Sequence, residues 1–203
     1  MEQGRYDALA RLASRADALA PGVRRTPGLL VLTDPGRTPD PAILARRLAP
    51  GTGLILRTFG EPRIEAAAFE IADIARARAL TLLISADPAL ARRCGAHGVH
   101  WPQWSAPRQP WPGALTTASV HDPAALRRAQ GRVNAVLISA IFASDSPSAG
   151  RPMGPFRLAA WARRSGVPVY ALGGVSLATV GRLQGLGVAG VAAVGAAARI
   201  PAG

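Results

Sequence analysis

The chain has 203 residues, of which 49% are hydrophobic, and a formal net charge of +12. This length and composition are typical of one domain with a full hydrophobic core. Its only cysteine, Cys94, excludes an intramolecular disulfide and a cysteine-based structural zinc site. The absence of lysine excludes Schiff-base and lysine general-base chemistry.

The N-terminus carries no apolar run of signal-peptide length, and no apolar stretch reaches the roughly 20 residues that span a bilayer. We therefore expect a soluble, cytoplasmic protein without a membrane partner. The positive charge raises the alternative of a basic nucleic-acid-associated protein. However, the arginines form pairs on separate predicted helices, with no aromatic platform between them, which favours solvated helix faces and no nucleic-acid partner. These pairs are Arg46-Arg47, Arg92-Arg93, Arg127-Arg128 and Arg163-Arg164.

Residues 5–19 have an amphipathic pattern, which predicts an N-terminal helical extension over residues 1–27 that closes the bottom of the fold. Residues 28–203 then alternate short apolar runs with helical patterns, as in consecutive βαβ units. Eight such units predict an α/β fold, a (β/α)₈ TIM barrel with an extra N-terminal helix. The predicted strands are residues 29–33, 53–57, 81–85, 98–100, 115–119, 135–139, 168–171 and 190–194.

Three helix starts are marked by an aspartate followed by proline: Asp40-Pro41, Asp87-Pro88 and Asp122-Pro123. The carboxylate caps free N–H groups of the first turn, and proline fits the first helical position, where its missing N–H breaks no helical bond. Ser176 is expected to cap the seventh helix in the same way. These aspartates are therefore interpreted as caps rather than as catalytic groups.

Active sites of (β/α)₈ barrels lie at the C-terminal ends of the strands. Gly173 and Gly174 follow the seventh predicted strand, and Gly195 and Ala196 follow the eighth. Glycines let the backbone approach an anion, and free N–H groups at a helix start bind phosphate. The pairing predicts a phosphate-binding site, although glycines that only permit tight turns remain an alternative. The polar residues expected at the other strand ends are Arg57, Ser85, His100, Gln103, Ser119, His121 and Ser139.

Several segments of the chain resemble the thiamine phosphate synthase/TenI family in order and spacing, over residues 29–197. They are Thr33-Asp34, Gly95 to His100 with Gln103, Ala118 to His121, Ile141-Phe142 before a serine-rich loop, Ala171 to Val175 and Gly190 to Val194. The resemblance implies a (β/α)₈ barrel acting on a thiazole phosphate. The family either couples it to a pyrimidine pyrophosphate with Mg²⁺ or isomerises a thiazole carboxylate phosphate. Gly173, Gly174, Gly195 and Ala196 would hold the phosphate.

The chain also departs from the family pattern. Ala86 replaces the Mg²⁺-binding aspartate, next to Ser85, so no metal ligand is predicted and Mg²⁺ is expected only if the protein is a synthase. Arg57 is the one residue kept from the family's pyrophosphate-binding Gln-x-Arg-x-Lys stretch. Ser144 and Ser146 keep hydroxyls in place of Thr-x-Thr-Lys, but the lysine is lost. Fewer cations weaken a site for a pyrophosphate leaving group, so coupling is disfavoured.

Isomerisation needs a bound phosphate and a proton-transfer group, and His121 is the candidate because imidazole titrates near ~6.5. It matches the histidine to which proton transfer is attributed in the TenI branch, although a structural role is equally consistent with its sequence. His100 is expected to be structural, and Ser119 to contact either the substrate or a buried backbone group. A phosphate-binding barrel without catalysis is the alternative function. A homodimer is possible.

Overall fold

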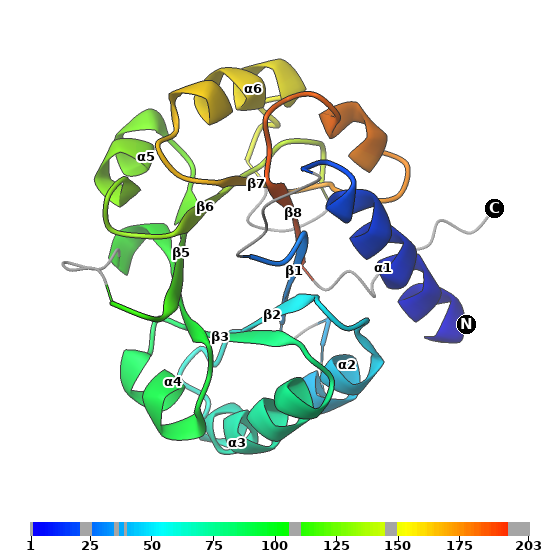
Figure 1. Cartoon of the computed structure of the whole chain (residues 1–203), viewed down its shortest axis with the longest axis vertical. Coiled ribbons are helices and arrows are strands. Elements are labelled where there is room, and N and C mark those ends of the chain that lie inside the picture. Colours follow the sequence, from blue (N-terminus) through cyan, green and yellow to red (C-terminus); the bar gives the residue numbers. More distant parts are fainter. Residues whose placement is uncertain are drawn as a thin grey trace.

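The computed structural model describes residues 2–20, 26–34, 37–38, 40–105, 111–144 and 150–194. Eight parallel strands pair in chain order and close into a barrel, with β1 beside β8. Helices surround the strands (Figure 1). The strands are β1 Leu29–Leu32, β2 Gly53–Leu56, β3 Thr81–Ser85, β4 Gly98–Trp101, β5 Leu115–Val120, β6 Ala135–Ile138, β7 Val169–Leu172 and β8 Gly190–Val194. The helices are α1 Glu2–Asp17, α2 Pro41–Arg47, α3 Pro62–Ala77, α4 Pro88–Cys94, α5 Pro123–Ala129 and α6 Pro155–Arg164, with 3₁₀ turns η1 Gln103–Ser105 and η2 Val180–Leu183.

Alternate residues of each strand face the barrel interior and the helices, as the period of two in a strand requires. In β1, Leu30 and Leu32 belong to a cluster of nine buried side chains inside the barrel, whereas Leu29 and Val31 pack in the larger cluster beneath the helices. The strands are apolar on both faces because both faces are covered. This explains why continuous apolar runs predict the strands to within about two residues at either end.

The predicted aspartate caps are confirmed. Asp40 accepts hydrogen bonds from the backbone N–H of Ala42 and Ile43, and Asp87 accepts one from Leu90 at 2.8 Å. Asp122 does the same for Ala125 at 2.7 Å, which contributes most to lowering the pKa of that carboxyl. These bonds begin α2, α4 and α5 at the sequence positions marked by Asp-Pro.

The seventh helix differs from the prediction, because the segment after β7 forms only the short turn η2. Ser176 does not cap it: the residue before η2 is Thr179, and its side chain makes no cap bond. Thr179 Oγ1 instead donates to the carbonyl of Gly174 at 2.9 Å and accepts the N–H of Ser176. The hydroxyl therefore ties η2 to the glycine turn at the end of β7.

The prediction that the N-terminal helix closes the bottom of the barrel is wrong. Helix α1 contacts β1, β8 and η2, and it lies in the outer ring of helices (Figure 1). Its apolar stripe, Leu9, Leu12 and Ala16, is buried in the cluster that also contains the outward-facing residues Leu29 and Val31 of β1. Inside the barrel, the bottom is filled by Tyr170, whose hydroxyl donates to the carbonyl of Pro27 at 2.5 Å.

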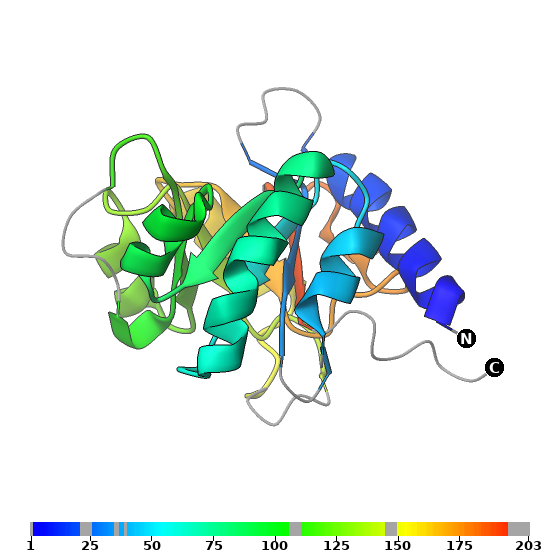
Figure 2. The same cartoon turned by 90° about the horizontal axis from the view of Figure 1, so that it is seen from below.

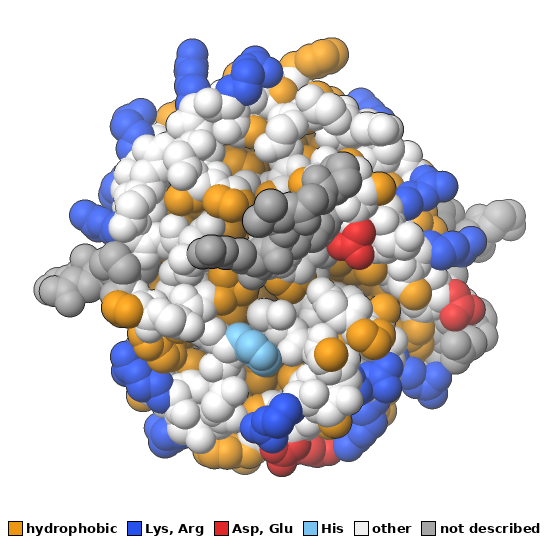
Figure 3. Space-filling model, viewed as in Figure 1, with side chains coloured by type: hydrophobic (Ala, Val, Ile, Leu, Met, Phe, Trp, Pro, Cys, Tyr) orange, Lys and Arg blue, Asp and Glu red, His pale blue; other side chains and the backbone are white. Residues whose placement is uncertain are grey.

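Figure 2 shows the barrel from the side, with β1 running downward and the segment after β6, in yellow, at the lower edge. The C-terminal strand ends, and hence the predicted site, lie at this edge. On the face in Figure 3, arginine side chains are spread around the periphery instead of forming one patch. Among the described helices, none is both long and apolar enough to cross a membrane.

Candidate active site

His100 lies inside the barrel near the C-terminal end of β4, where it is 2% exposed. Its Nδ1 lies 2.9 Å from Thr117 Oγ1 and its Nε2 lies 3.0 Å from Ser119 Oγ, so both ring nitrogens are engaged. Burial lowers the pKa of His100 to about 3, and the positive charge of Arg57 acts in the same direction. A neutral imidazole that joins two residues of β5 has a structural part in this site, and Ser119 is held by it.

His121 lies just beyond β5, exposed at the rim of the barrel. Its Nδ1 lies 3.0 Å from Ser139 Oγ and 3.3 Å from the Ser139 carbonyl oxygen at the end of β6. The carbonyl can only accept, so this geometry favours a proton on Nδ1 and leaves the lone pair of Nε2 for another group. The ring is therefore oriented by its neighbouring strand and presents one nitrogen as a base.

Gln103, in η1 after β4, fixes the backbone on which His121 sits. Its Oε1 accepts the N–H of His121 at 2.7 Å, and its Nε2 donates to Asp122 Oδ2, also at 2.7 Å. Asp122 in turn caps α5 through Ala125. The side-chain carboxamide of Gln103 thus joins the loops after β4 and β5. The sequence predicts Gln103 only as a pocket residue and gives no signal of this connection.

Arg57, the retained cation of the family's pyrophosphate stretch, is already paired. Its Nη2 lies 2.9 Å from Asp34 Oδ2, and its Nε donates to the carbonyl of Thr33. Burial is the main cause that lowers the pKa of Arg57, and the ion pair with Asp34 opposes it. The guanidinium stacks on the ring of Phe59 at 5.0 Å. An anion at this position would have to displace a carboxylate that the fold itself supplies.

The residues present do not fit a Mg²⁺ site. Asp34 is held by Arg57, and the carboxylate of Asp87 accepts the N–H of Leu90 as a helix cap. Ala86 supplies no side-chain oxygen, and in the part of the chain that the structure describes no three His, Cys, Asp or Glu side chains cluster to hold a metal. Mg²⁺ prefers several oxygen ligands around an octahedron, which the described residues at this edge of the barrel do not provide.

Gly173 and Gly174 end β7 in left-handed conformations, with φ of 93° and 64°. A Cβ on Gly174 would lie 2.2 Å from the carbonyl oxygen of Ala143, and one on Gly173 would lie 2.9 Å from the Cα of Ala140. The segment after β6 packs directly on this turn, where the N–H of Phe142 donates to the Gly173 carbonyl at 2.9 Å. Close approach of two loops thus requires both glycines whether or not phosphate binds there.

The same turn carries backbone donors that no described residue accepts. Among the described residues, the backbone N–H groups of Gly173, Gly174 and Val175 have no hydrogen-bond acceptor. Consecutive free N–H groups in a turn with positive φ form a concave anion-binding site. Arg182 of η2 lies over the ring of Phe142 at 4.9 Å, which brings a cation to the loops that meet this turn. Arg182 was not predicted, because one arginine among 24 basic residues carries no distinguishing signal.

Not every predicted residue can be placed. Ser146, Gly195 and Ala196 lie outside the described residues, whereas Ser144 is described and partly buried after β6. At the end of β3, Ser85 pairs in register with His100. Its side chain belongs to the strand face that points into the barrel. The structure therefore brings together two groups, His100 with Ser119 and His121 with Gln103 and Ser139, and places the glycine turn against the loop after β6.

We expect Gly174→Ala to lower the free energy of unfolding by about 2 to 4 kcal/mol, from the clash with Ala143 and the left-handed backbone. Gly185→Ala is the matched control, because Gly185 has φ of 74° but nothing within 4 Å of its Cβ position. It should cost only about 1 kcal/mol. Urea unfolding followed by circular dichroism gives both values. Equal losses for the two variants would contradict the close packing of the two loops.

A known protein family matches most of the chain. The profile of the family described as thiamine monophosphate synthase matches residues 29–197, which covers all eight strands. The chain belongs to the thiamine monophosphate synthase/TenI family. No curated protein sequence gives a significant match. The predicted barrel and the predicted family are therefore both confirmed.

Solved structures of several proteins share the fold. The barrel is similar to thiamine phosphate pyrophosphorylase from Pyrococcus furiosus, with a TM-score of 0.69, 18% identity, and 82% of this chain and 84% of that chain covered. It is also similar to the enzyme of that name from Bacteroides thetaiotaomicron, with a TM-score of 0.56, 16% identity and 83% of each chain covered. An HpcH/HpaI aldolase from Desulfitobacterium hafniense matches with a TM-score of 0.56 and 13% identity, over 82% of this chain and 85% of that chain. At these identities the likeness extends to the fold alone.

Proposed function

We propose that this barrel binds a thiazole phosphate and moves a proton within its thiazole ring by means of His121. The phosphate would accept hydrogen bonds from the N–H groups of Gly173, Gly174 and Val175. These donors have no acceptor among the described residues, and they are the observation that carries the proposal. Gly195 and Ala196, after β8, are proposed to complete the phosphate site. Membership of the family supports a phosphorylated thiamine precursor as the ligand.

His121 supports proton transfer by its geometry. With Nδ1 turned to Ser139, Nε2 can take a proton from one ring position of the substrate and return it to another, so that the imidazole is regenerated in each turnover. The hydrogen bond from the backbone N–H of His121 to Gln103 Oε1 holds the backbone that carries the imidazole ring. No metal is needed for this step, which agrees with a donor set that does not fit Mg²⁺.

Coupling to a pyrimidine pyrophosphate is not proposed. Departure of pyrophosphate needs cations that stabilise the developing charge, and here the one retained arginine is occupied by Asp34. Binding without catalysis is the second candidate, since the free backbone donors would serve it equally well. Turnover of a thiazole carboxylate phosphate separates the two candidates.

Binding is tested by isothermal titration calorimetry with thiazole phosphate and, as the matched probe, the same thiazole alcohol without phosphate. We expect thiazole phosphate to bind and the thiazole alcohol to bind far more weakly. The reason is that most hydrogen-bond donors of the proposed site would bind the phosphate group. Equal affinity for the two compounds, or no binding of the phosphate at millimolar concentration, would exclude the site. A substitution at Gly173 is a poor test, because any side chain there disturbs Ala140.

A further inference from the structure

A second hollow lies beside His121, on the outer side of the strand ends. This pocket of about 500 Å³ is formed between the loops after β5 and β6 and the start of α6. Its size falls within the range of small-molecule sites. Its lining is His121, Asp122, Pro123, Ser139, Ala140, Gly150, Arg151, Met153, Arg157 and Trp161, and it includes none of the glycine-turn residues 173–175. It is therefore distinct from the proposed phosphate site.

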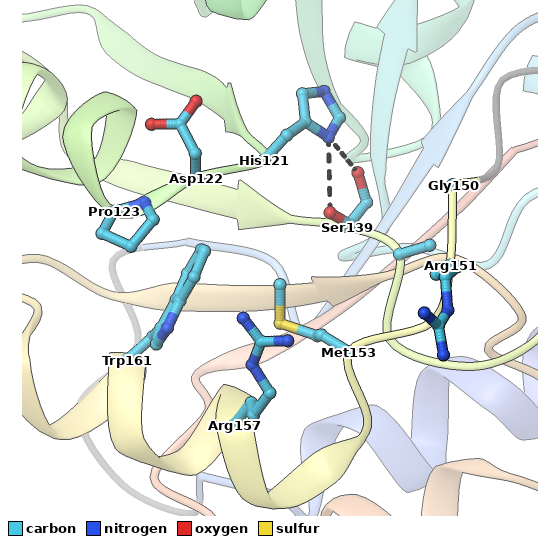
Figure 4. A pocket seen from close by; sticks show the side chains of 10 residues that line it. His121, Asp122, Pro123, Ser139, Gly150, Arg151, Met153, Arg157 and Trp161 are labelled. Atoms are coloured by element: carbon cyan, nitrogen blue, oxygen red, sulfur yellow. Dashed lines mark hydrogen bonds between the residues drawn. The ribbon is translucent and has the colours of Figure 1, made fainter.

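Arg157 gives this pocket its chemistry. Its side chain rises from the first turn of α6 and points between Trp161 and Met153 toward Ser139 at the end of β6 (Figure 4). His121, after β5, lies next to Ser139. Arg157 and Trp161 are four residues apart and so share one helix face. Among the described residues neither Arg157 nor Arg151 has an acidic partner or a hydrogen bond. The guanidinium fork is thus available to a ligand.

The surroundings of Arg157 also favour negative charge. Helix α6 has ten residues and begins at Gly154 and Pro155 without a side-chain cap, so its first turn leaves free donors and a positive dipole end. The one acidic residue of the lining, Asp122, is turned to other partners: one oxygen accepts the N–H of Ala125, and the other accepts Gln103 Nε2. These hydrogen bonds stabilise the negative charge of Asp122 within the fold.

The apolar walls define the rest of the ligand. Met153, Pro123 and Trp161 give the pocket apolar walls, and such walls pack against carbon rather than against a bare ion. A planar carboxylate matches the fork of an arginine through two parallel hydrogen bonds. We propose that this pocket binds a small organic carboxylate with a flat apolar body, whose carboxylate pairs with Arg157. The pocket shares His121 and Ser139 with the proposed proton-transfer site, but the carboxylate is assigned to Arg157, which has no part in the proposed function.

The test uses benzoate as the probe and the full-length protein. We expect saturable binding by calorimetry, with an affinity about 5- to 10-fold weaker in Arg157→Gln because a charged hydrogen bond is lost at an exposed position. Arg163→Gln, in the last turn of the same helix, should bind like the unaltered protein. Benzyl alcohol, which keeps the ring and lacks the charge, should bind at least about 5-fold more weakly.

Three results would overturn the proposal: equal benzoate affinity in Arg157→Gln and Arg163→Gln, equal affinity for benzoate and benzyl alcohol, or a benzoate-induced shift of backbone resonances that spares Trp161. Thiazole phosphate is titrated into the same variants. Loss of benzoate binding with thiazole phosphate binding intact would show that the two sites are separate. Absence of thiazole phosphate binding from every variant would refute the proposed function and leave the carboxylate pocket standing.

Discussion

Replacing His121 with alanine is expected to lower the turnover of a thiazole carboxylate phosphate by about 10²- to 10⁴-fold, the usual contribution of one general acid–base group. Affinity for thiazole phosphate should stay within about twofold, because the proposed phosphate donors are backbone N–H groups in the turn after β7 and do not involve His121. The interconversion is followed by proton NMR, and affinity by calorimetry on the same preparation.

The control for this variant is His97→Ala. His97 is an exposed histidine in the turn before β4, at the opposite edge of the barrel from the strand ends. The His97→Ala substitution removes an imidazole from a position where no substrate is proposed, so turnover should be unchanged. A fully active His121→Ala variant would mean that another group transfers the proton. Equal losses in both variants would point to damage to the fold rather than to the site.

Acid is expected to destabilise the protein through His100. Burial lowers the pKa of His100 from 6.5 to about 3, so between these pH values the unfolded chain takes up a proton that the folded chain excludes. The free energy of unfolding therefore falls as the pH drops through this window, and this contribution is constant above it. At about pH 4.5 the loss attributable to His100 amounts to about 2 to 3 kcal/mol relative to neutral pH.

Urea unfolding across the pH range isolates this contribution by comparison with His100→Gln. Glutamine keeps a polar group near Ser119 but takes up no proton, so the variant should start less stable at neutral pH and lose less on acidification. His121→Gln is the control, because it removes an exposed histidine and should keep the steep acid dependence. Parallel curves for the unaltered protein and His100→Gln would contradict a neutral, buried His100.

Local patterns predict the parts of this fold that local physics determines. The strand bounds follow from short apolar runs covered on both faces, and α2, α4 and α5 start where Asp-Pro supplies a cap and a helical φ. The position of α1 could not be predicted in the same way. Its apolar stripe specifies that one face is buried, but which surface it covers depends on how much of the barrel wall the later helices leave open.

The positions of the candidate residues at the strand ends were predicted, but their hydrogen-bond partners were not. The strand-end residues Arg57, His100 and His121 follow from the barrel architecture, but their partners come from loops far away in sequence. Asp34 neutralises Arg57 across 23 residues, and Gln103 reaches His121 across 18. Nothing in the periodicity of the chain marks such pairs. The glycines after β7 show the same limit, since their steric need comes from the loop after β6.

The proposed binding of a thiazole phosphate depends on backbone donors after β7. Its most direct measurement is a ¹H–¹⁵N NMR titration of the labelled protein with thiazole phosphate, with the thiazole alcohol as the reference. The amide resonances of Gly173, Gly174 and Val175 should shift saturably with the phosphate and little with the alcohol. Unmoved amides at these three residues in the presence of bound ligand would contradict it.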